Sequence, residues 1–421
     1  MVMPAGLEQA LVSARTGPVF EVTEHAPHTH GGADWLVIAS GVAVDRLHGA
    51  FIPTSGAGRS PDQASARRNA LYECAERLAL REPPGRGHGP AGPDCPLAGR
   101  TVPVRDLASG AMLDRPAGDF YLHPPPCPRA AGPDRPTSNG AAAGDSYWSA
   151  VERGLLELLE RDALMTTWRF GLRPPRLPAD DLVPDQVEAL RGQGLTLTLA
   201  DLSPLHGLPI VVCVAGGQVD GHLVRTVGSA ADRTLRRAAA RAAVEAGSVH
   251  QVAAERLRLG RHEELTFGDF VDHAFYYLDP DKARLLDLFD SGPVATARAT
   301  ARATARAAAL GDDSGQTDSG QTDSGQTDSG QTDCEQDRSE QNVRALAERL
   351  ARAGVAIHAA DITPAWLRPH GIHTIVARSP DLYPLELGPG SPDLARRLRR
   401  HPARQALVSG RPVNLAPIPL A

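Results

Sequence analysis

Two stretches of the sequence repeat a spacing of acidic and basic residues that suits the binding of a metal ion. Each contains the motif E-x-x-E-R, once in "YECAERLAL" and once in "LELLERDAL". The motif residues are Glu73, Glu76 and Arg77 in the first stretch, and Glu157, Glu160 and Arg161 in the second. Residues three and four apart share one face of an α-helix, so each motif places two carboxylates and a guanidinium side by side.

A less specific interpretation is that the glutamate and arginine four residues apart form ion pairs on solvated helix faces. Each such pair contributes only about 0.3–0.5 kcal/mol. We favour a shared site because both helices follow a glycine-containing segment, at 55–62 and 138–146, which we interpret as loops. Small residues there let backbone N–H groups approach a ligand, and a helix start favours an anion. A third predicted helix, 232–251, carries Glu245 in a comparable setting.

Clustered carboxylates of this kind predict a cation site. Four or five negative side chains repel one another unless a cation lies between them, and these helix faces carry neither His nor Cys. Hard oxygen ligands are those that Mg²⁺ prefers. Because Mg²⁺ usually keeps water and takes substrate phosphates as further ligands, the sequence predicts a nucleotide triphosphate, with ATP as the natural candidate.

The composition excludes several other classes of site. Lys282 is the only lysine among 44 Lys and Arg residues and lies in "LDPDKARLL", which excludes a P-loop and any other Schiff-base lysine. The formal net charge of -6 does not favour nucleic acid as a partner, and no apolar run is long enough to span a membrane. The five cysteines form no C-x-x-C pair and no secretion signal is evident, so we expect reduced thiols in the cytoplasm.

The elements that must position these residues alternate between helices and strands. The segments 194–214 and 354–378 share a pattern of a strand, an Asp-Leu-Ser-Pro or Asp-Ile-Thr-Pro turn, a glycine and a second strand. Each follows a helical stretch, which predicts an α/β fold of repeated helix–strand units with mixed sheets. Two unrelated strand–turn–strand pieces are the alternative explanation.

The segment 295–341 differs in composition from the rest of the chain. An alanine- and arginine-rich run is followed by four tandem copies of DSGQT, which offer almost nothing to bury. We therefore expect a low-complexity, disordered insertion without a catalytic role.

The stretch 138–168, "SNGAAAGDSYWSAVERGLLELLERDALMTTW", resembles the central signature of the YcaO family. That signature has S-N-G, a further glycine, and a helix ending in L-L-E-L-x-E-R-D-A with a Trp after it. The segments 70–77, 241–245 and 359–387 resemble the family's other blocks in the same order. The similarity covers nearly the whole chain outside the low-complexity segment. It implies a single YcaO-like catalytic domain over 1–421, with mixed sheets and helices around a central ATP and Mg²⁺ site.

The resemblance implies an enzyme that binds ATP without a P-loop and modifies the backbone of a ribosomally made precursor peptide. In the best-known members a Cys, Ser or Thr side chain attacks the preceding carbonyl, ATP phosphorylates the amide oxygen, and loss of phosphate leaves a thiazoline or oxazoline. Carried over by position, the metal ligands are Glu73, Glu76, Glu157, Glu160 and Glu245. The nucleotide contacts are Ser138, Asn139, Arg161 and Arg77.

Several positions depart from the family pattern. The usual G-K-G before the first helix has Ala57 at its centre, and the usual E-x-x-Q-x-R of the third block has Ser248 and His250 in place of Gln and Arg. The segment "NLAPIPLA" lacks the full P-x-P-x-P pattern of azoline-forming members. These changes leave open a thioamide-forming enzyme, a macroamidine-forming enzyme, and a member that binds peptide as a scaffold without using ATP.

The resemblance also implies partners. No separate leader-binding domain is recognisable before the catalytic blocks, so we expect a partner protein to deliver the precursor peptide. A homodimer is one form of assembly consistent with this expectation.

Overall fold

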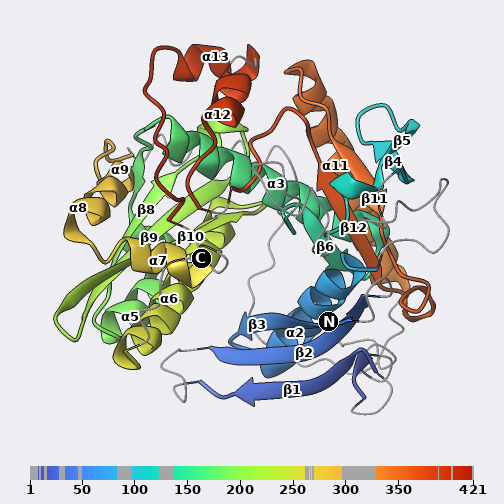
Figure 1. Cartoon of the computed structure of the whole chain (residues 1–421), viewed down its shortest axis with the longest axis horizontal. Coiled ribbons are helices and arrows are strands. Elements are labelled where there is room, and N and C mark those ends of the chain that lie inside the picture. Colours follow the sequence, from blue (N-terminus) through green and yellow to red (C-terminus); the bar gives the residue numbers. More distant parts are fainter. Residues whose placement is uncertain are drawn as a thin grey trace. The chain divides into compact units, whose positions relative to one another are not determined.

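In the computed structural model, the chain forms antiparallel sheets with helices packed on them (Figure 1). This architecture confirms the predicted mixed α/β class. The structure describes residues 8, 11–13, 17–27, 34–45, 50–82, 97, 99–122, 137–260, 265, 267, 270–295, 329–386, 388–399 and 402–419. The chain divides into two units, which we treat separately. Unit 1 comprises residues 1–158 and 328–381, and unit 2 comprises residues 159–327 and 382–421. That both act as one catalytic domain stays a prediction.

The first sheet of unit 1 has the strand order β1-β2-β3 and carries helix α2 on one face. Its elements are β1 (Val19–His25), β2 (Trp35–Asp45), β3 (Ala50–Ser60) and α2 (Gln63–Ala79). Helix α2 begins after Asp62, whose carboxylate accepts a hydrogen bond from the Ser65 N–H at 2.8 Å and caps the helix. Alternate β2 residues, among them Val37 and Ala39, bury against the Leu71 and Cys74 face of α2. This packing fixes the helix that carries the first E-x-x-E-R motif.

The glycine-containing segment before α2 is part of strand β3, so our prediction of a loop that approaches a ligand is wrong there. A Cβ on Gly56 would lie 2.3 Å from the carbonyl oxygen of Ala70, and a Cβ on Gly58 would lie 1.9 Å from that of Ala66. Both glycines therefore serve the close approach of strand and helix backbones. In the second segment only Ser138–Gly140 forms a turn, because β6 (Ala141–Gly144) follows at once.

We expect Gly58→Ala to destabilise the protein by about 1–3 kcal/mol, because the new methyl group meets helix backbone that cannot move aside alone. Urea unfolding of the variant and of wild type measures the change. Gly216→Ala is the matched control, since a Cβ at this strand glycine would find its nearest neighbour at 3.5 Å. Equal destabilisation by both substitutions would contradict the packing explanation.

The second sheet of unit 1 has the strand order β5-β4-β11-β12-β6. Its strands other than β6 are β4 (Thr101–Asp106), β5 (Met112–Pro116), β11 (His358–Asp361) and β12 (His373–Arg378), and the short helices η1 (Ala117–Asp119) and η5 (Arg368–His370) lie between them in the chain. Helix α11 (Ser329–Arg352) contacts the first turns of helix α3 (Tyr147–Arg169). There the Asn342 side chain donates to Glu152 at 3.3 Å, and the Arg344 guanidinium lies over the Trp148 ring.

Helix α11 corrects part of the prediction for 295–341. Residues 296–328 lie outside the described part of the chain, but the helix begins at Ser329, so the last residues of that segment are helical. Val343, Leu346 and Leu350 bury one face of α11 at helical spacing. A helix that is anchored by such a face extends into polar residues that would not form a helix alone, because propagation costs less than nucleation.

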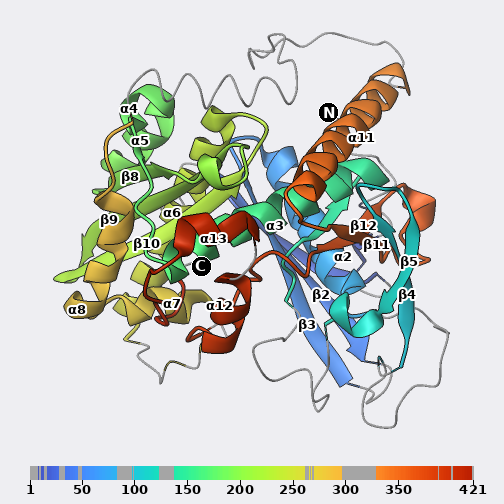
Figure 2. The ribbon, with the colours of Figure 1, turned by 90° about the horizontal axis from the view of Figure 1, so that it is seen from above.

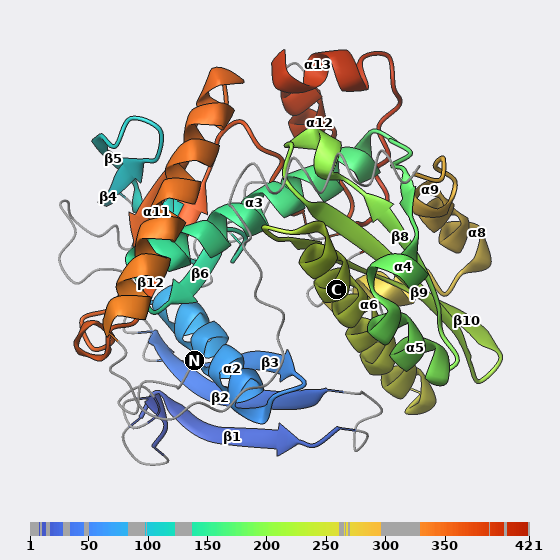
Figure 3. The ribbon, with the colours of Figure 1, turned by 180° about the vertical axis from the view of Figure 1, so that it is seen from behind.

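The sheet of unit 2 has the strand order β10-β9-β8-β7, with helix α6 along β9 and β10 (Figure 3). Its elements are β7 (Arg176–Leu177), β8 (Thr196–Asp201), β9 (Ile210–Val219), β10 (His222–Ala231), α4 (Ala179–Leu182), α5 (Pro184–Gly192), η3 (Ser203–Leu205) and α6 (Leu235–Arg258). Alanines 238, 242 and 246 of α6 pack against Val211 and Cys213 of β9. Small side chains on this helix face bring α6 close to the sheet.

The predicted repeat of helix, strand, turn and strand is confirmed. Helix α5 precedes the antiparallel pair β8 and β9, and α11 precedes the antiparallel pair β11 and β12. Both turns use the same hydrogen bond: the Asp201 carboxylate accepts from Ser203 N–H, and the Asp361 carboxylate accepts from Thr363 N–H, each at 2.9 Å. The shared turn geometry favours a true repeat over a coincidence of pattern.

Unit 2 also contains further helices and a chain segment that we call the tail, residues 414–419. The helices are α7 (Phe270–Tyr276), α8 (Pro280–Ala283), η4 (Arg284–Leu286), α9 (Asp287–Asp290), α12 (Pro392–Arg399) and α13 (Pro402–Val408). Tail carbonyl oxygens accept hydrogen bonds from the side chains of Trp168, Arg169, His273 and Tyr277. The tail thus runs beside α7 (Figure 2), and Ile418 within it is fully buried.

A surface carboxylate in unit 1 gives a pH-dependent prediction. Burial tends to raise the pKa of Glu24, but hydrogen bonds from Arg67 at 2.6 Å and from Gln63 outweigh it, so the pKa lies below its usual value. The ionised form is the stabilising one, so its contribution is complete above the usual pKa and is lost as pH falls through the lowered one. We expect Glu24→Gln to cost less than about 1 kcal/mol at pH 7 and nothing once the pH lies below that lowered value, measured by urea unfolding.

In the described residues no helix is both long enough and apolar enough to cross a membrane.

Candidate functional site

Helix α2 of unit 1 holds the first motif against strand β3. The Glu73 carboxylate accepts a hydrogen bond from the Ala57 N–H at 2.9 Å and forms an ion pair with Arg77. The Arg77 guanidinium also donates to the carbonyl oxygen of Ser55 at 2.6 Å. Both side chains are therefore oriented by the backbone of the strand on which the helix packs.

Glu76 and Glu157 place two negative charges close together in unit 1. Burial raises the pKa of Glu76 well above its usual value, and the charges of Glu157 and Glu73 raise it further. Arg77 and Arg153 act in the opposite direction without cancelling the effect. A carboxyl group whose charged form is disfavoured in this way gains from a bound cation, so this region fits Mg²⁺.

Glu160 and Glu245 form a second acidic pair, in unit 2. The Glu160 carboxylate accepts hydrogen bonds from the Ser229 hydroxyl at 2.6 Å and the Ala231 N–H at 3.0 Å, and Glu245 accepts from the Ser229 N–H at 3.0 Å. Burial raises the pKa of Glu245 to about 7, with a smaller contribution from the Glu160 charge. The Arg161 guanidinium lies 3.6 Å from Glu160 and 3.9 Å from Glu245 and opposes that shift.

The two units orient a helix carboxylate in the same way. In unit 1 the N–H of the residue after Gly56 donates to Glu73, and in unit 2 the N–H of the residue after Gly228 donates to Glu245. A Cβ on Gly228 would lie 2.4 Å from the N atom of Ala246, so this strand also meets its helix at a glycine. Each unit therefore supplies one helix carboxylate that is oriented by a strand N–H beside a glycine contact.

Ser138 and Asn139 lie in a turn that strand β12 holds in place. Asn139 is buried, and within the described residues its Oδ1 atom has no hydrogen-bond partner. Gly140 has a φ of 74°, and a Cβ there would lie 2.4 Å from the carbonyl oxygen of Ala377. The glycine of S-N-G is therefore required by both backbone conformation and space. The turn that it allows holds the buried amide oxygen of Asn139, which a ligand can satisfy.

Arg378 at the end of β12 is a residue that our sequence analysis missed. Its guanidinium donates to the carbonyl oxygens of Asp119, Thr137 and Asn139, and these hydrogen bonds hold the S-N-G turn in place. Burial lowers its pKa to about 10, against the opposing charge of Glu157. The available signal was its place in segment 359–387, which resembles a block of the family.

The departures at positions 57, 248 and 250 have distinct surroundings. Ala57 contributes its N–H to Glu73 but has no side-chain donor, and the Ser248 hydroxyl donates to the carbonyl oxygen of Val244 in its own helix. His250 is buried, and burial lowers its pKa. None of the three substitutes restores the Lys, Gln or Arg that the family pattern has there.

The donor chemistry fits Mg²⁺ with nucleotide phosphates. All five predicted ligands are carboxylates, and no group of three or more His, Cys, Asp or Glu side chains in the described chain is gathered to hold a metal by itself. Mg²⁺ is usually bound through one or two carboxylates and completes its shell with water and phosphate oxygens. Acidic pairs such as Glu76 with Glu157, and Glu160 with Glu245, match that requirement.

We expect Ser229→Ala to weaken Mg²⁺-dependent ATP binding by about tenfold, because Glu160 loses a donor to a charged group while Glu245 keeps the backbone N–H. Calorimetric titration with ATP at fixed Mg²⁺ measures the change. Ser248→Ala on α6 is the control, since its hydroxyl bonds only helix backbone in the described contacts. Equal affinities of wild type and Ser229→Ala would remove Ser229 from the site.

These features define an α/β protein with acidic helix faces and a backbone-held S-N-G turn, rather than a P-loop protein. A model of the YcaO family, described as a cyclodehydratase that binds ATP and Mg²⁺, matches residues 99–382. The chain belongs to the YcaO family, whose cofactors are ATP and Mg²⁺.

One curated relative is distant in sequence. An uncharacterized protein of Methanothermobacter thermautotrophicus is 27% identical over 188 residues, which cover 39% of this chain and 48% of that relative. The chain thus spans about half the length of the curated relative that it matches.

Solved structures share the fold at greater length. A heterocyclase in complex with substrate and cofactor has a TM-score of 0.68 at 18% identity, covering 100% of this chain and 57% of that chain. The YcaO protein of Methanopyrus kandleri, bound with AMPPCP and Mg²⁺, has a TM-score of 0.59 at 19% identity, covering 91% and 89%. The Escherichia coli microcin synthetase McbBCD complex has a chain with a TM-score of 0.54 at 16% identity, covering 86% and 88%.

Proposed function

We propose that this chain is an ATP- and Mg²⁺-dependent enzyme that modifies the backbone of a ribosomal precursor peptide. The observation that carries the proposal is the presence of two acidic pairs, in each of which one carboxyl group, Glu76 or Glu245, has a raised pKa, in a chain that belongs to the YcaO family. Glu73, Glu76, Glu157, Glu160 and Glu245 are the proposed Mg²⁺ ligands. Ser138, Asn139, Arg77 and Arg161 are the proposed nucleotide contacts.

The proposed reaction is cyclodehydration of Cys, Ser or Thr to thiazoline or oxazoline. The thiol or hydroxyl gives up its proton as it bonds to the preceding carbonyl carbon, and the carbonyl oxygen takes the γ-phosphoryl group of ATP, which releases ADP. That oxygen then leaves as phosphate, and loss of the amide proton completes the C=N bond of the ring. Mg²⁺ held by the proposed carboxylates would supply positive charge to the phosphates. Arg161, held between Glu160 and Glu245, adds a second positive charge of fixed orientation.

Partner and compartment follow as parts of the same proposal. A partner protein delivers the precursor peptide, which is consistent with the similarity to a chain of the McbBCD complex. The cytoplasm is the proposed compartment, because Cys74 and Cys213 are buried free thiols.

The decisive experiment follows the oxygen of the amide. A precursor peptide with a heavy-oxygen label in the carbonyl before a Cys, Ser or Thr is incubated with the full chain, its partner, ATP and Mg²⁺. Cyclodehydration loses one water per ring and moves the label into phosphate, as mass spectrometry of peptide and phosphate reveals. Gain of sulfur in place of oxygen would instead assign thioamide formation, and rings that depend on a peptide amine would assign macroamidine formation. Unlabelled phosphate and an unchanged peptide would favour a scaffold.

A further inference from the structure

Within the described part of the chain, strand β10 is an edge of the unit 2 sheet, because β9 is its only neighbour there. In an antiparallel pair, alternate residues bond to the partner strand and the residues between them point their N–H and C=O groups outward. The N–H of Asp232 donates to the carbonyl oxygen of Pro209, in register with the pairing of His222 to Ala231 with β9. The backbone N–H and C=O groups of the even-numbered residues of β10 therefore bond to β9, and those of the odd-numbered residues point outward from the sheet edge.

The outward groups near the acidic pair are already engaged. The N–H groups of Ser229 and Ala231 donate to Glu245 and Glu160, and the carbonyl oxygen of Ala231 accepts from Arg241 at 3.1 Å. These side chains occupy positions along the edge where the groups of another strand would otherwise lie. The edge of β10 thus leads directly to the proposed Mg²⁺ ligands.

The other end of the same edge is different. Among the residues that the structure describes, none bonds the outward N–H groups of Leu223 and Arg225. Leu223 is 49% exposed, so this part of the strand is accessible. An edge with unsatisfied N–H and C=O groups is a template for pairing with another extended chain.

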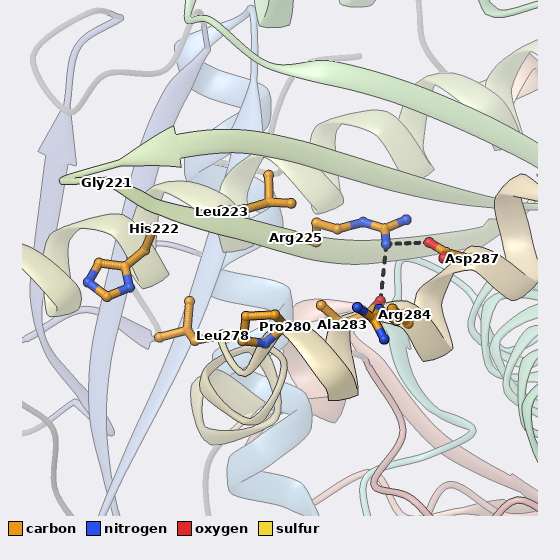
Figure 4. Close-up of a pocket in the computed structure, with 9 residues that line it drawn as sticks. All are labelled: Gly221, His222, Leu223, Arg225, Leu278, Pro280, Ala283, Arg284 and Asp287. Atoms are coloured by element: carbon orange, nitrogen blue, oxygen red, sulfur yellow. Dashed lines mark hydrogen bonds and ion pairs between the residues drawn. The ribbon is translucent and has the colours of Figure 1, made fainter.

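A groove of about 330 Å³ lies beside these residues (Figure 4). Leu223 lines one side, and Leu278, Pro280 and Ala283 line the other. The Arg225 guanidinium crosses toward α9 and donates to Asp287 at 2.8 Å. The groove therefore offers an apolar surface next to the unpaired backbone, and the Arg225 side chain forms part of its lining.

We infer that the edge of β10 at Leu223 and Arg225 binds an extended peptide, which adds to the sheet as a further strand and places an apolar side chain in the groove. This inference rests on the proposed function, for which it supplies the docking site of the substrate. Main-chain hydrogen bonds give affinity in this mode, and the groove gives a preference for alternate apolar side chains. With a rise of about 3.3 Å per residue, a peptide paired at Arg225 reaches the level of Ser229 after four residues.

A peptide fits this edge better than a second copy of the chain does. Leu223 and Arg225 are the outward residues at the exposed end of the strand, because Val227 is fully buried and the outward N–H groups of Ser229 and Ala231 are engaged by Glu245 and Glu160. So short a paired run buries far less surface than a stable subunit interface needs. It suits a substrate that must bind, react and leave.

Leu223→Pro tests the edge without disturbing the β9–β10 pairing. Proline removes only the outward N–H of residue 223, and proline is tolerated at edge strands for that reason. The probe is a fluorescent eight-residue peptide of alternating valine and threonine, used at saturating ATP and Mg²⁺ with the full chain. We expect anisotropy titration to give binding that is about tenfold weaker for Leu223→Pro than for wild type, and a smaller loss for Leu223→Ala.

A second probe keeps the test independent of how the variant folds. The same peptide with N-methyl groups on its backbone cannot donate to β10, and we expect wild type not to bind it. Calorimetric ATP binding, measured on the same samples, should be unchanged in both Leu223 variants.

The outcomes separate the docking edge from the proposed function. Equal binding of both peptides by wild type, no binding of either, or equal binding by wild type and folded Leu223→Pro would overturn the docking edge while ATP binding stood. Self-association of wild type that Leu223→Pro abolishes would assign the edge to a second copy and would also overturn it. Absence of Mg²⁺-dependent ATP binding by folded wild type would instead remove the proposed function.

Discussion

Glu157→Gln lowers Mg²⁺-dependent ATP binding by at least about 100-fold while the fold stays intact, because a charged metal ligand is replaced by a neutral amide. The same change removes a negative charge that raises the pKa of Glu76. We therefore expect thermal stability in the absence of Mg²⁺ to stay equal or rise as ATP binding falls. Calorimetry for binding and thermal unfolding for stability measure these opposite responses.

The control for this prediction is Glu188→Gln on helix α5, where the glutamate is exposed. It makes the same chemical change away from either acidic pair, so binding and stability should both match wild type. Unchanged ATP binding in Glu157→Gln would remove this residue from the metal site. Loss of binding together with a loss of stability would point to a structural role.

Arg169→Leu destabilises the protein by about 3–5 kcal/mol, because it leaves Glu386 as a buried charge without its ion-pair partner. The Arg169 guanidinium is fully buried, lies 3.1 Å from Glu386, and donates to tail carbonyl oxygens of Asn414 and Ala416. Removing it therefore also leaves tail acceptors without their donor. Urea unfolding followed by tryptophan fluorescence suits the measurement, because Trp168 contacts the tail.

Arg191→Leu provides the comparison with a surface ion pair. Arg191 and Asp180 lie 2.5 Å apart, but their side chains are 60% and 64% exposed. Solvent and salt screen such a pair, so we expect a cost of less than about 1 kcal/mol. Similar costs for the two arginines would mean that burial does not control the contribution of these pairs.

Helical spacing predicted the elements that carry the carboxylates. Helices α2, α3 and α6 all lie where the E-x-x-E-R motifs and Glu245 required them, because a helix face is set by residues three and four apart in the chain. The turn after Asp201 and its counterpart after Asp361 were also predicted, since a short sequence determines a local hydrogen bond.

Contacts between distant parts of the chain were not predictable in this way. The segment at Gly56 and Gly58 has the composition of a loop, and only the alternation of its glycines indicated a strand packed on a helix. Ser229 and Arg378 lie outside the two E-x-x-E-R motifs, and each contacts residues far away in the sequence. Their roles depend on strand pairing, which a single sequence does not specify.

The tail has a consequence for the order in which the protein is made. Trp168, Arg169, His273 and Tyr277 all donate to carbonyl oxygens of residues 414–418, which leave the ribosome long after those side chains do. The core of unit 2 therefore cannot be completed while its sheet is being synthesised. It stays incomplete until the tail has been synthesised. The tail is bound through its backbone, but residues 417–419 are also buried, so only sequences with side chains that fit this buried path can complete the step.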